Sequence, residues 1–201
     1  MLTSMNTMSI EKRTYQLKSR AAALQQTRER IVAATMQLHQ EVGTALTTVA
    51  EVARRSGVQR LTVYNHFPDD AELFGACQAH WMALHPLPDF DAVLADDPVE
   101  RMRATLLGYY AWYRETEPMA GNIQRDRHAI PALDSLMQRT ADARADQLAD
   151  TLAAALGAGA GRRALIRLAL DFWTWRRLSR EGLDDAAAAD LMTAAACSES
   201  G

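Results

Sequence analysis

The chain has 201 residues, of which 48% are hydrophobic and 23% are charged, and its formal net charge is −3. This length fits one ordinary domain with a smaller second one, and the composition excludes a disordered chain. No uncharged apolar stretch is long enough to span a membrane, and the first 20 residues lack the apolar core of a secretory signal, so we expect a cytoplasmic protein. Cys77 and Cys197 are too few for a disulfide framework and do not have zinc-site spacing.

The charge is unevenly distributed along the chain. Residues 1–68 carry nine Lys or Arg and four Asp or Glu, a net +5, whereas residues 69–201 carry thirteen and twenty-one, a net −8. A basic N-terminal part joined to an acidic body indicates that the first part binds a polyanion and that the second part has a different role.

Residues 1–26 are expected to form a flexible basic arm, because the segment is rich in Thr, Ser, Met and Asn and its beginning shows no helical periodicity. The arm either follows the minor groove of DNA or is a solvated tail. Its basic residues near the start of the chain are Lys12, Arg13, Lys18 and Arg20.

Three short helices are predicted between Thr27 and Pro68. The first shows apolar residues at steps of three and four and ends at Gly43. Thr48 and Glu51 have the spacing of a capping box, which begins a second helix that ends near Ser56. Gly57 permits a sharp turn, and a third helix from about residue 60 to 66 is stopped by the proline.

The acidic body is predicted to be helical throughout, which gives an all-α fold of about nine helices. A loop is expected at residues 86–98, and a hinge of small residues at 157–161. The predicted helices span about 69–85, 99–115, 119–128, 131–156, 162–180 and 184–197. Pro118 is expected to separate the second and third of these.

The segment from Thr47 to Phe67, TTVAEVARRSGVQRLTVYNHF, resembles the DNA-binding domain of the TetR family of bacterial transcriptional regulators. It has the Thr-capped helix, the Ser-Gly-Val turn, the Thr-hydrophobic-Tyr step and the His-Phe end of the family pattern. The resemblance implies a helix-turn-helix domain at 27–68 and a helical ligand-binding and dimerisation domain at 69–201. Asp70 stands where the family usually has a Lys, which puts a phosphate contact at that point in question.

In a helix-turn-helix motif the last helix lies in the major groove of DNA. Arg60 is the strongest candidate for reading a base, because a guanidinium can bond guanine O6 and N7 together, and the alternative is a phosphate contact. Tyr64 could instead pack mainly against the first helix. The candidate DNA-binding residues are Thr48, Gln59, Arg60, Leu61, Thr62, Tyr64, Asn65 and His66.

Aromatic residues in the acidic body are candidates for the lining of a ligand cavity, and ordinary core packing is the alternative. The neighbouring Arg125, Arg127 and His128 could bind an acidic group of a ligand or form a solvated face. The candidate ligand-binding residues are Trp81, Met102, Tyr109, Tyr110, Trp112, Tyr113 and His128.

The helix predicted at 162–180 has two apolar faces and therefore needs two partners. The last helix is rich in alanine, which permits close helix approach. We expect these two helices to pair with their copies in a four-helix interface, as the resemblance implies. The candidate interface residues are Leu165, Leu168, Phe172, Trp175, Ala187 and Leu191.

The sequence thus predicts a ligand-responsive transcriptional repressor that binds a palindromic double-stranded DNA operator as a homodimer and is released by a small-molecule effector. No cofactor, metal or enzymatic activity is expected. One alternative is a small metal- or thiol-dependent helical enzyme, because Cys77 and His80 lie one helical turn apart, although no third partner is nearby. Another is a ligand-independent DNA-binding protein, against which the acidic, aromatic-rich body argues.

Overall fold

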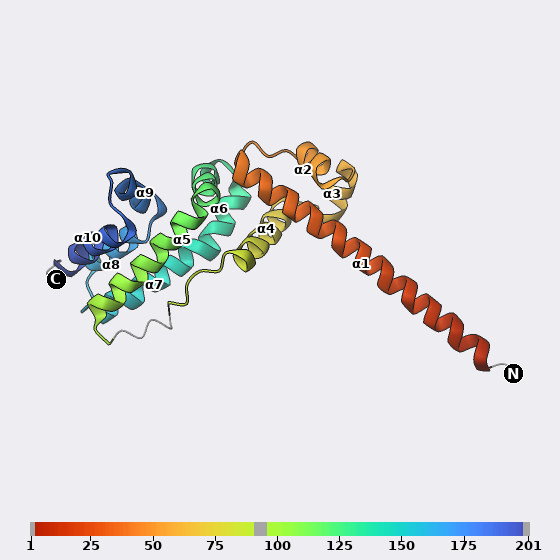
Figure 1. The fold of residues 1–201 in the computed structure, drawn as a ribbon, viewed down its shortest axis with the longest axis horizontal. Helices are drawn as coiled ribbons and strands as arrows, with labels where there is room; N and C mark the ends of the chain where they lie inside the picture. The colour runs from red at the N-terminus through yellow and green to blue at the C-terminus, as the bar shows by residue number, and fades with distance from the viewer. Residues whose placement is uncertain (1–2, 91–95, 199–201) are drawn as a thin grey trace.

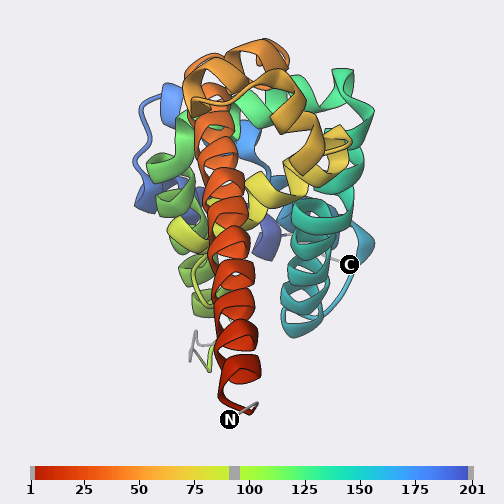
Figure 2. The ribbon, with the colours of Figure 1, turned by 90° about the vertical axis from the view of Figure 1, so that its right-hand side faces the viewer.

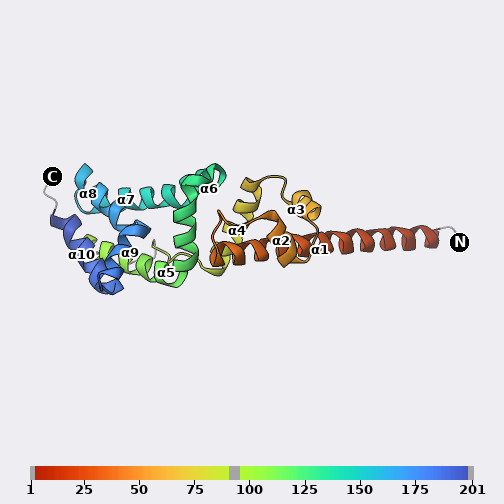
Figure 3. The same cartoon turned by 90° about the horizontal axis from the view of Figure 1, so that it is seen from above.

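The computed structural model describes residues 3–90 and 96–198, and over these residues it contains helices and no strand, as the sequence predicted. The helices are α1 (Thr3–Glu41), α2 (Val49–Ser56), α3 (Arg60–His66), α4 (Asp70–Leu84), α5 (Pro98–Asp126), η1 (Arg127–Ala129), α6 (Pro131–Met137), η2 (Gln138–Asp142), α7 (Ala143–Ala155), α8 (Ala160–Ala169), α9 (Phe172–Arg180) and α10 (Asp185–Ser198). The molecule is elongated, with the start of α1 at one end and α8 to α10 at the other (Figures 1 and 3).

Helix α1 differs from the arm expected at the N-terminus, because it is already helical at Thr3. No Gly or Pro occurs before Gly43, and Ala21 to Ala23 are strong helix formers, so nothing interrupts the helix on the N-terminal side of its buried half. Residues 18–26 are exposed, which explains why this part of the sequence lacks an apolar period. The side chains of Lys12 and Arg13 lie outside the described part of the chain.

In the three-helix unit formed by α1, α2 and α3, the predicted Thr48 cap and Gly57 turn are present, but Glu51 bonds Arg54 and does not reach back to the cap. The Thr48 hydroxyl accepts a hydrogen bond from the Glu51 amide at 3.2 Å. Gly57 adopts a left-handed conformation with φ of 69°, and its amide donates to the carbonyls at the end of α2. The Glu51 carboxylate bonds Arg54 at 2.5 Å. The core of this unit includes the buried side chains Ile31, Val52, Val63 and Phe67.

Helix α5 continues through Pro118, where the sequence analysis expected two helices. A proline inside a helix costs about 3 kcal/mol, because it removes one backbone hydrogen bond and crowds the preceding turn. Buried side chains on both sides of it, including Tyr113 and Met119, hold the two halves in line. Gly121 brings this helix within van der Waals reach of the Phe172 ring. The packing of both halves therefore outweighs the local cost.

The predicted helix at 162–180 is in fact two helices, α8 and α9, separated by Leu170 and Asp171. The Asp171 carboxylate caps α9 by accepting from the amides of Trp173 and Thr174 at 2.8 and 3.1 Å. At the end of α8, the Tyr110 hydroxyl donates to the Ala169 carbonyl at 2.9 Å. The Tyr113 hydroxyl donates to the Leu170 carbonyl, also at 2.9 Å. Tertiary hydrogen bonds thus stabilise a break that no Gly or Pro marks in the sequence.

Candidate functional site

Helix α3 presents its polar side chains outward. Val63 is 2% exposed and anchors the helix to the core, whereas Leu61 is 66% exposed and Tyr64 is 53% exposed. The candidate DNA-binding side chains Thr48, Gln59, Arg60 and Asn65 are also exposed, and those of Thr62 and His66 are half-buried. The candidate DNA-binding residues therefore form one accessible surface along α3 and the start of α2.

Positive charge accompanies this surface on α1. The guanidinium of Arg28 lies 4.2 Å from the centre of the Phe67 ring, just behind α3. Lys18 and Arg20 are exposed further along the same helix. Figure 2 shows this part of α1 extending beyond α2 and α3. Exposed basic side chains beside an exposed helix-turn-helix are an arrangement that favours binding to the phosphates of DNA.

A cavity of about 820 Å³ lies between the DNA-binding unit and the helical body. Its wall combines Met36 and His39 of α1 and a face of α4 with residues of α5, α6, η2 and α7 and of the turn that begins α9. Trp81, Tyr109, Trp112, Tyr113 and His128, which are candidate ligand-binding residues, line it. Its size falls within the range of small-molecule sites.

Two of the predicted lining residues are absent from this wall. Met102 and Tyr110 are fully buried and pack in the core of the body, so assigning them to the cavity was wrong. They share α5 with Tyr109 and Tyr113 but face α8 and α10, and sequence spacing alone could not decide which side of the helix meets the cavity.

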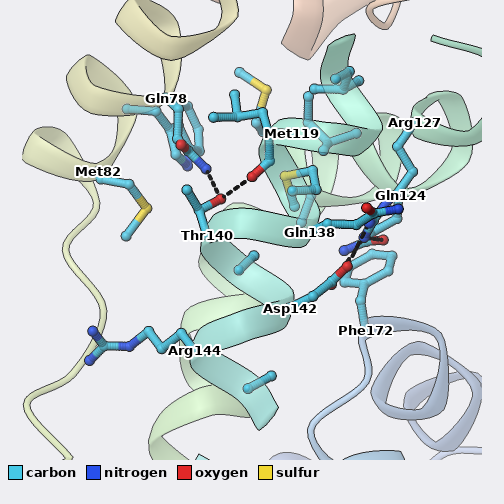
Figure 4. A pocket seen from close by; sticks show the side chains of 18 of the residues that line it. Gln78, Met82, Met119, Gln124, Arg127, Gln138, Thr140, Asp142, Arg144 and Phe172 are labelled. Carbon is cyan, nitrogen blue, oxygen red and sulfur yellow. Dashed lines mark hydrogen bonds and ion pairs between the residues drawn. The ribbon is translucent and has the colours of Figure 1, made fainter. Parts of the chain in front are cut away.

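The polar part of the wall was not predicted from the sequence. It is formed by Gln78, Gln124, Gln138, Thr140 and Asp142, shown in Figure 4. Three of these belong to η2, a π-helical turn that changes the direction of the side chains between α6 and α7. The sequence predicted one regular amphipathic segment from Pro131 to Leu156, which gave no signal for this change.

Arg127 is buried at the cavity wall and is neutralised by two carboxylates. It bonds Asp134 at 2.6 Å and Asp142 at 2.6 Å. The hydrogen bond from Arg127 holds the pKa of Asp134 below its ordinary value. The neighbouring Arg125 instead bonds Asp126, and the His128 side chain is 79% exposed at the edge. These residues therefore do not form the cluster of available bases that sequence proximity suggested.

His39 is the contribution of α1 to the deeper wall. Its side chain is 4% exposed and lies 5.8 Å from the Phe74 ring, centre to centre. Burial lowers its pKa from 6.5 to about 4, and the nearby Asp126 only partly opposes that shift. The imidazole is consequently neutral at physiological pH.

Side chains at the end of α5 form hydrogen bonds to backbone groups at the end of α1 and in the loop that follows it. The Asn122 amide donates to the carbonyls of His39 and Gln40, each at 2.9 Å. The Asp126 carboxylate accepts from the Ala45 amide at 3.0 Å in the loop that follows. The DNA-binding unit is thus joined to the body at a fixed point beside the cavity, while α4 forms a separate part of the cavity wall.

Cys77 and His80 do not form a catalytic or metal-binding pair. The Cys77 thiol is buried, and burial raises its pKa to about 12, whereas His80 is exposed. Among the side chains that the structure describes, there is no group of three or more His, Cys, Asp or Glu placed to hold a metal ion.

The predicted dimer-interface residues divide into two groups. Phe172 and Trp175 are each 1% exposed and pack inside their own chain, so assigning them to an interface was wrong. The break before α9 turns them toward Tyr113. Leu165 is half-buried against the same core, while Leu168, Ala187 and Leu191 are exposed on α8 and α10.

Comparison with known proteins agrees with this geometry. Residues 31–77, from the buried half of α1 to the middle of α4, match the family described as "Bacterial regulatory proteins, tetR family". The helix-turn-helix domain is a TetR-family domain. No curated protein sequence matches the chain.

Solved structures extend the likeness of fold beyond the TetR-family domain. A TetR-like transcriptional regulator from Rhodococcus sp. RHA1 is 17% identical, with a TM-score of 0.60 over 85% of this chain and 93% of that one. A second transcriptional regulator from the same source is 20% identical, with a TM-score of 0.62 over 84% and 94%. RolR in complex with its ligand resorcinol is 21% identical, with a TM-score of 0.52 over 88% of each chain. The chain therefore has a TetR-like fold. In its described part, every helix is too short or too polar to cross a membrane.

Proposed function

We propose that this protein is a transcriptional repressor that binds a palindromic operator through α3 as a homodimer and leaves it when a small molecule enters the cavity. The outward presentation of Arg60 and its neighbours beside the exposed bases of α1 carries the DNA-binding part of this proposal. The TetR-family match over the same helices supports it.

The homodimer is inferred from exposed apolar side chains on α8 and α10. Leu168 is 51% exposed and Leu191 is 49% exposed, and the small side chain of Ala187 lies on the same helix as Leu191. A two-fold pair through such a surface uses the same patch on both subunits and presents two copies of α3 to one duplex. A palindromic operator would match that symmetry.

The effector response rests on what the cavity wall is made of. Met36 and His39 belong to α1 of the DNA-binding unit, and α4, which packs on α1, supplies Phe74, Gln78 and Trp81. A molecule held against these side chains contacts the DNA-binding unit directly. It can therefore shift the angle between that unit and the body, because a ligand favours the arrangement that it binds best. The fold shared with RolR, whose complex contains resorcinol, is consistent with a ligand in the helical body.

The test begins with operator fragments selected from the source genome by the purified protein. Arg60→Ala should weaken binding to the selected operator by about 5-fold to 150-fold, the equivalent of about 1–3 kcal/mol for one bidentate base contact. Binding to random DNA at the same salt concentration should fall much less. Arg177→Ala, at an exposed site on α9 far along the chain from the DNA-binding domain, is the matched control and should change neither.

Equal losses on operator and random DNA would reduce Arg60 to a phosphate contact. A protein that selects no fragment over random DNA would contradict the regulator function itself. If fragments are selected, the genes beside them would indicate which compounds to assay for release of the operator.

A further inference from the structure

The cavity wall has a broad aromatic component. The side chains involved are Trp81, Tyr109, Trp112, Tyr113 and Trp173, with the almost fully buried Phe172 packed against Tyr113 and Trp173. The rings of Tyr109 and Tyr113 meet edge to face with their centres 5.3 Å apart, and those of Phe172 and Trp173 do so at 5.1 Å. The Tyr113 hydroxyl is already bonded to the Leu170 carbonyl, so this residue offers its ring rather than a polar group. Such surfaces stack on flat apolar molecules.

The charges on the wall are already satisfied within the protein. Arg127 lies between Asp134 and Asp142, as described above. Arg167 bonds Asp146 at 3.0 Å and lies 3.7 Å from Asp142. The Asp171 carboxylate is occupied by the amides that begin α9, and His39 is neutral.

Arg144 is the exception at the edge of the cavity. It pairs with no carboxylate in the part of the chain that the structure describes, and its guanidinium lies 6.0 Å from the centre of the Phe90 ring. Its side chain is exposed and points away from the side of Asp142 and Arg127 (Figure 4). Because solvent reaches this guanidinium, it contributes little to binding a charge held deeper in the cavity.

Neutral hydrogen-bonding groups remain available on the α4 side. The Gln78 amide nitrogen donates to the Thr140 hydroxyl at 2.8 Å, and that hydroxyl donates to the Leu136 carbonyl at 2.7 Å. Within residues 3–90 and 96–198 the Gln78 carbonyl oxygen has no hydrogen-bond partner. A ligand hydroxyl or amide could donate to this oxygen (Figure 4).

We propose that the effector is an uncharged aromatic molecule that places its rings on the aromatic wall and a hydroxyl or amide group at Gln78 and Thr140. This inference rests on the proposed function of the cavity. A carboxylate or ammonium group would lose its hydrating water against a wall whose charges already have partners. New ion pairs would not compensate for the free energy of that desolvation. The cavity of about 820 Å³ accommodates several fused rings.

The same contact gives the effector a way to act on DNA binding. Gln78 belongs to α4 and Thr140 to η2, so their hydrogen bond joins the DNA-binding side of the cavity to the body. A ligand that donates to the Gln78 carbonyl oxygen binds the same side chain that makes this link, so it can alter how the two sides of the cavity meet. Binding and release are therefore coupled at one pair of residues.

The test uses calorimetric titration of the full-length, DNA-free protein at neutral pH with three probes that share one ring system. These are naphthalene-2-carboxamide, naphthalene-2-carboxylate and 2-naphthylmethylammonium. The amide should bind at least about tenfold more tightly than either charged probe. A charged probe that binds as tightly as the amide, or a failure of all three to bind, would overturn the proposal.

Variants test the polar contact and the charge balance separately. Gln78→Leu should weaken the amide by about 2-fold to 12-fold, as expected for one neutral hydrogen bond, whereas Gln147→Leu on the exposed side of α7 should leave it unchanged. If Gln78→Leu does not fold, Thr140→Val probes the same contact. Asp142→Asn removes one of the two negative charges bonded to Arg127 and should raise the affinity of the carboxylate relative to the amide. Unchanged relative affinities across these variants would contradict the assignment.

Operator binding measured with the same probes separates this inference from the proposed function. Release of operator by the carboxylate alone would support a regulator but refute the uncharged effector. Tight amide binding with operator retained would support the ligand class but refute release as the mechanism.

Discussion

Gly43 lies at the point where the DNA-binding unit is fixed to the body, and Gly43→Ala should expose the strength of that junction. Its φ is +94°, which disfavours any side chain, and a Cβ there would overlap Arg125 Nη2 and lie 2.6 Å from Asp126 Oδ2. Gly182 has almost the same φ, +93°, but a Cβ there meets nothing within 4 Å. The two substitutions therefore share the backbone strain and differ in the contact with α5.

The shared strain amounts to about 1–2 kcal/mol for a left-handed alanine. Arg125 is half-exposed and can move at little cost, whereas Asp126 is buried and would lose its hydrogen bond from the Ala45 amide. A hydrogen bond to a charged group contributes about 1.5–3 kcal/mol. We therefore expect the free energy of unfolding to fall by roughly 2.5–5 kcal/mol for Gly43→Ala, and by about 1–2 kcal/mol for Gly182→Ala.

Urea unfolding followed by circular dichroism measures both values under the same conditions. Hydrogen exchange at the Ala45 amide would show whether the loss is located at the junction. Equal destabilisation by the two substitutions would refute the argument, because it would mean that Asp126 adds nothing beyond the backbone strain.

Two further predictions concern pH and assembly. Burial lowers the pKa of His39 from 6.5 to about 4. Between these two pH values the imidazole is protonated in the unfolded chain and neutral in the folded chain. Between neutral pH and pH 4, the free energy of unfolding should therefore fall by roughly 3 kcal/mol more in the wild type than in His39→Gln. Urea unfolding at a series of pH values measures this difference, and an equal fall in the two proteins would contradict the prediction. Leu191→Asp should convert a dimer to a monomer in sedimentation, whereas Leu84→Asp, at a similarly exposed leucine on α4, should not; a dimeric Leu191→Asp would place the interface elsewhere.

Local signals were sufficient for the helix-turn-helix because its boundaries are set by nearby groups. The Thr48 hydroxyl caps α2 over three residues, and Gly57 supplies the turn through its own backbone freedom. The core positions Val52 and Val63 follow from helical periodicity once those boundaries are known. The same local logic predicted α4, whose first turn is capped by Asp69.

The cavity was only partly predictable. Its aromatic residues were evident from composition, but the side chains that decide its charge were not. Arg127 is neutralised by Asp134 of α6 and Asp142 of the π-helical turn, which lie 7 and 15 residues further along the chain. The sequence has Arg125, Arg127 and His128 within four residues, which suggests available positive charge, but the folded protein has little there.

The sequence by itself determined the all-helical architecture and the exposed surface of α3, since capping, turn and periodicity act within a few residues. Only the tertiary structure decided that α5 passes through Pro118, that α8 and α9 separate at Asp171, and which face of α5 borders the cavity. At each of these places the free energy of packing and of long-range hydrogen bonds exceeds local preference, and those contacts join residues tens of positions apart.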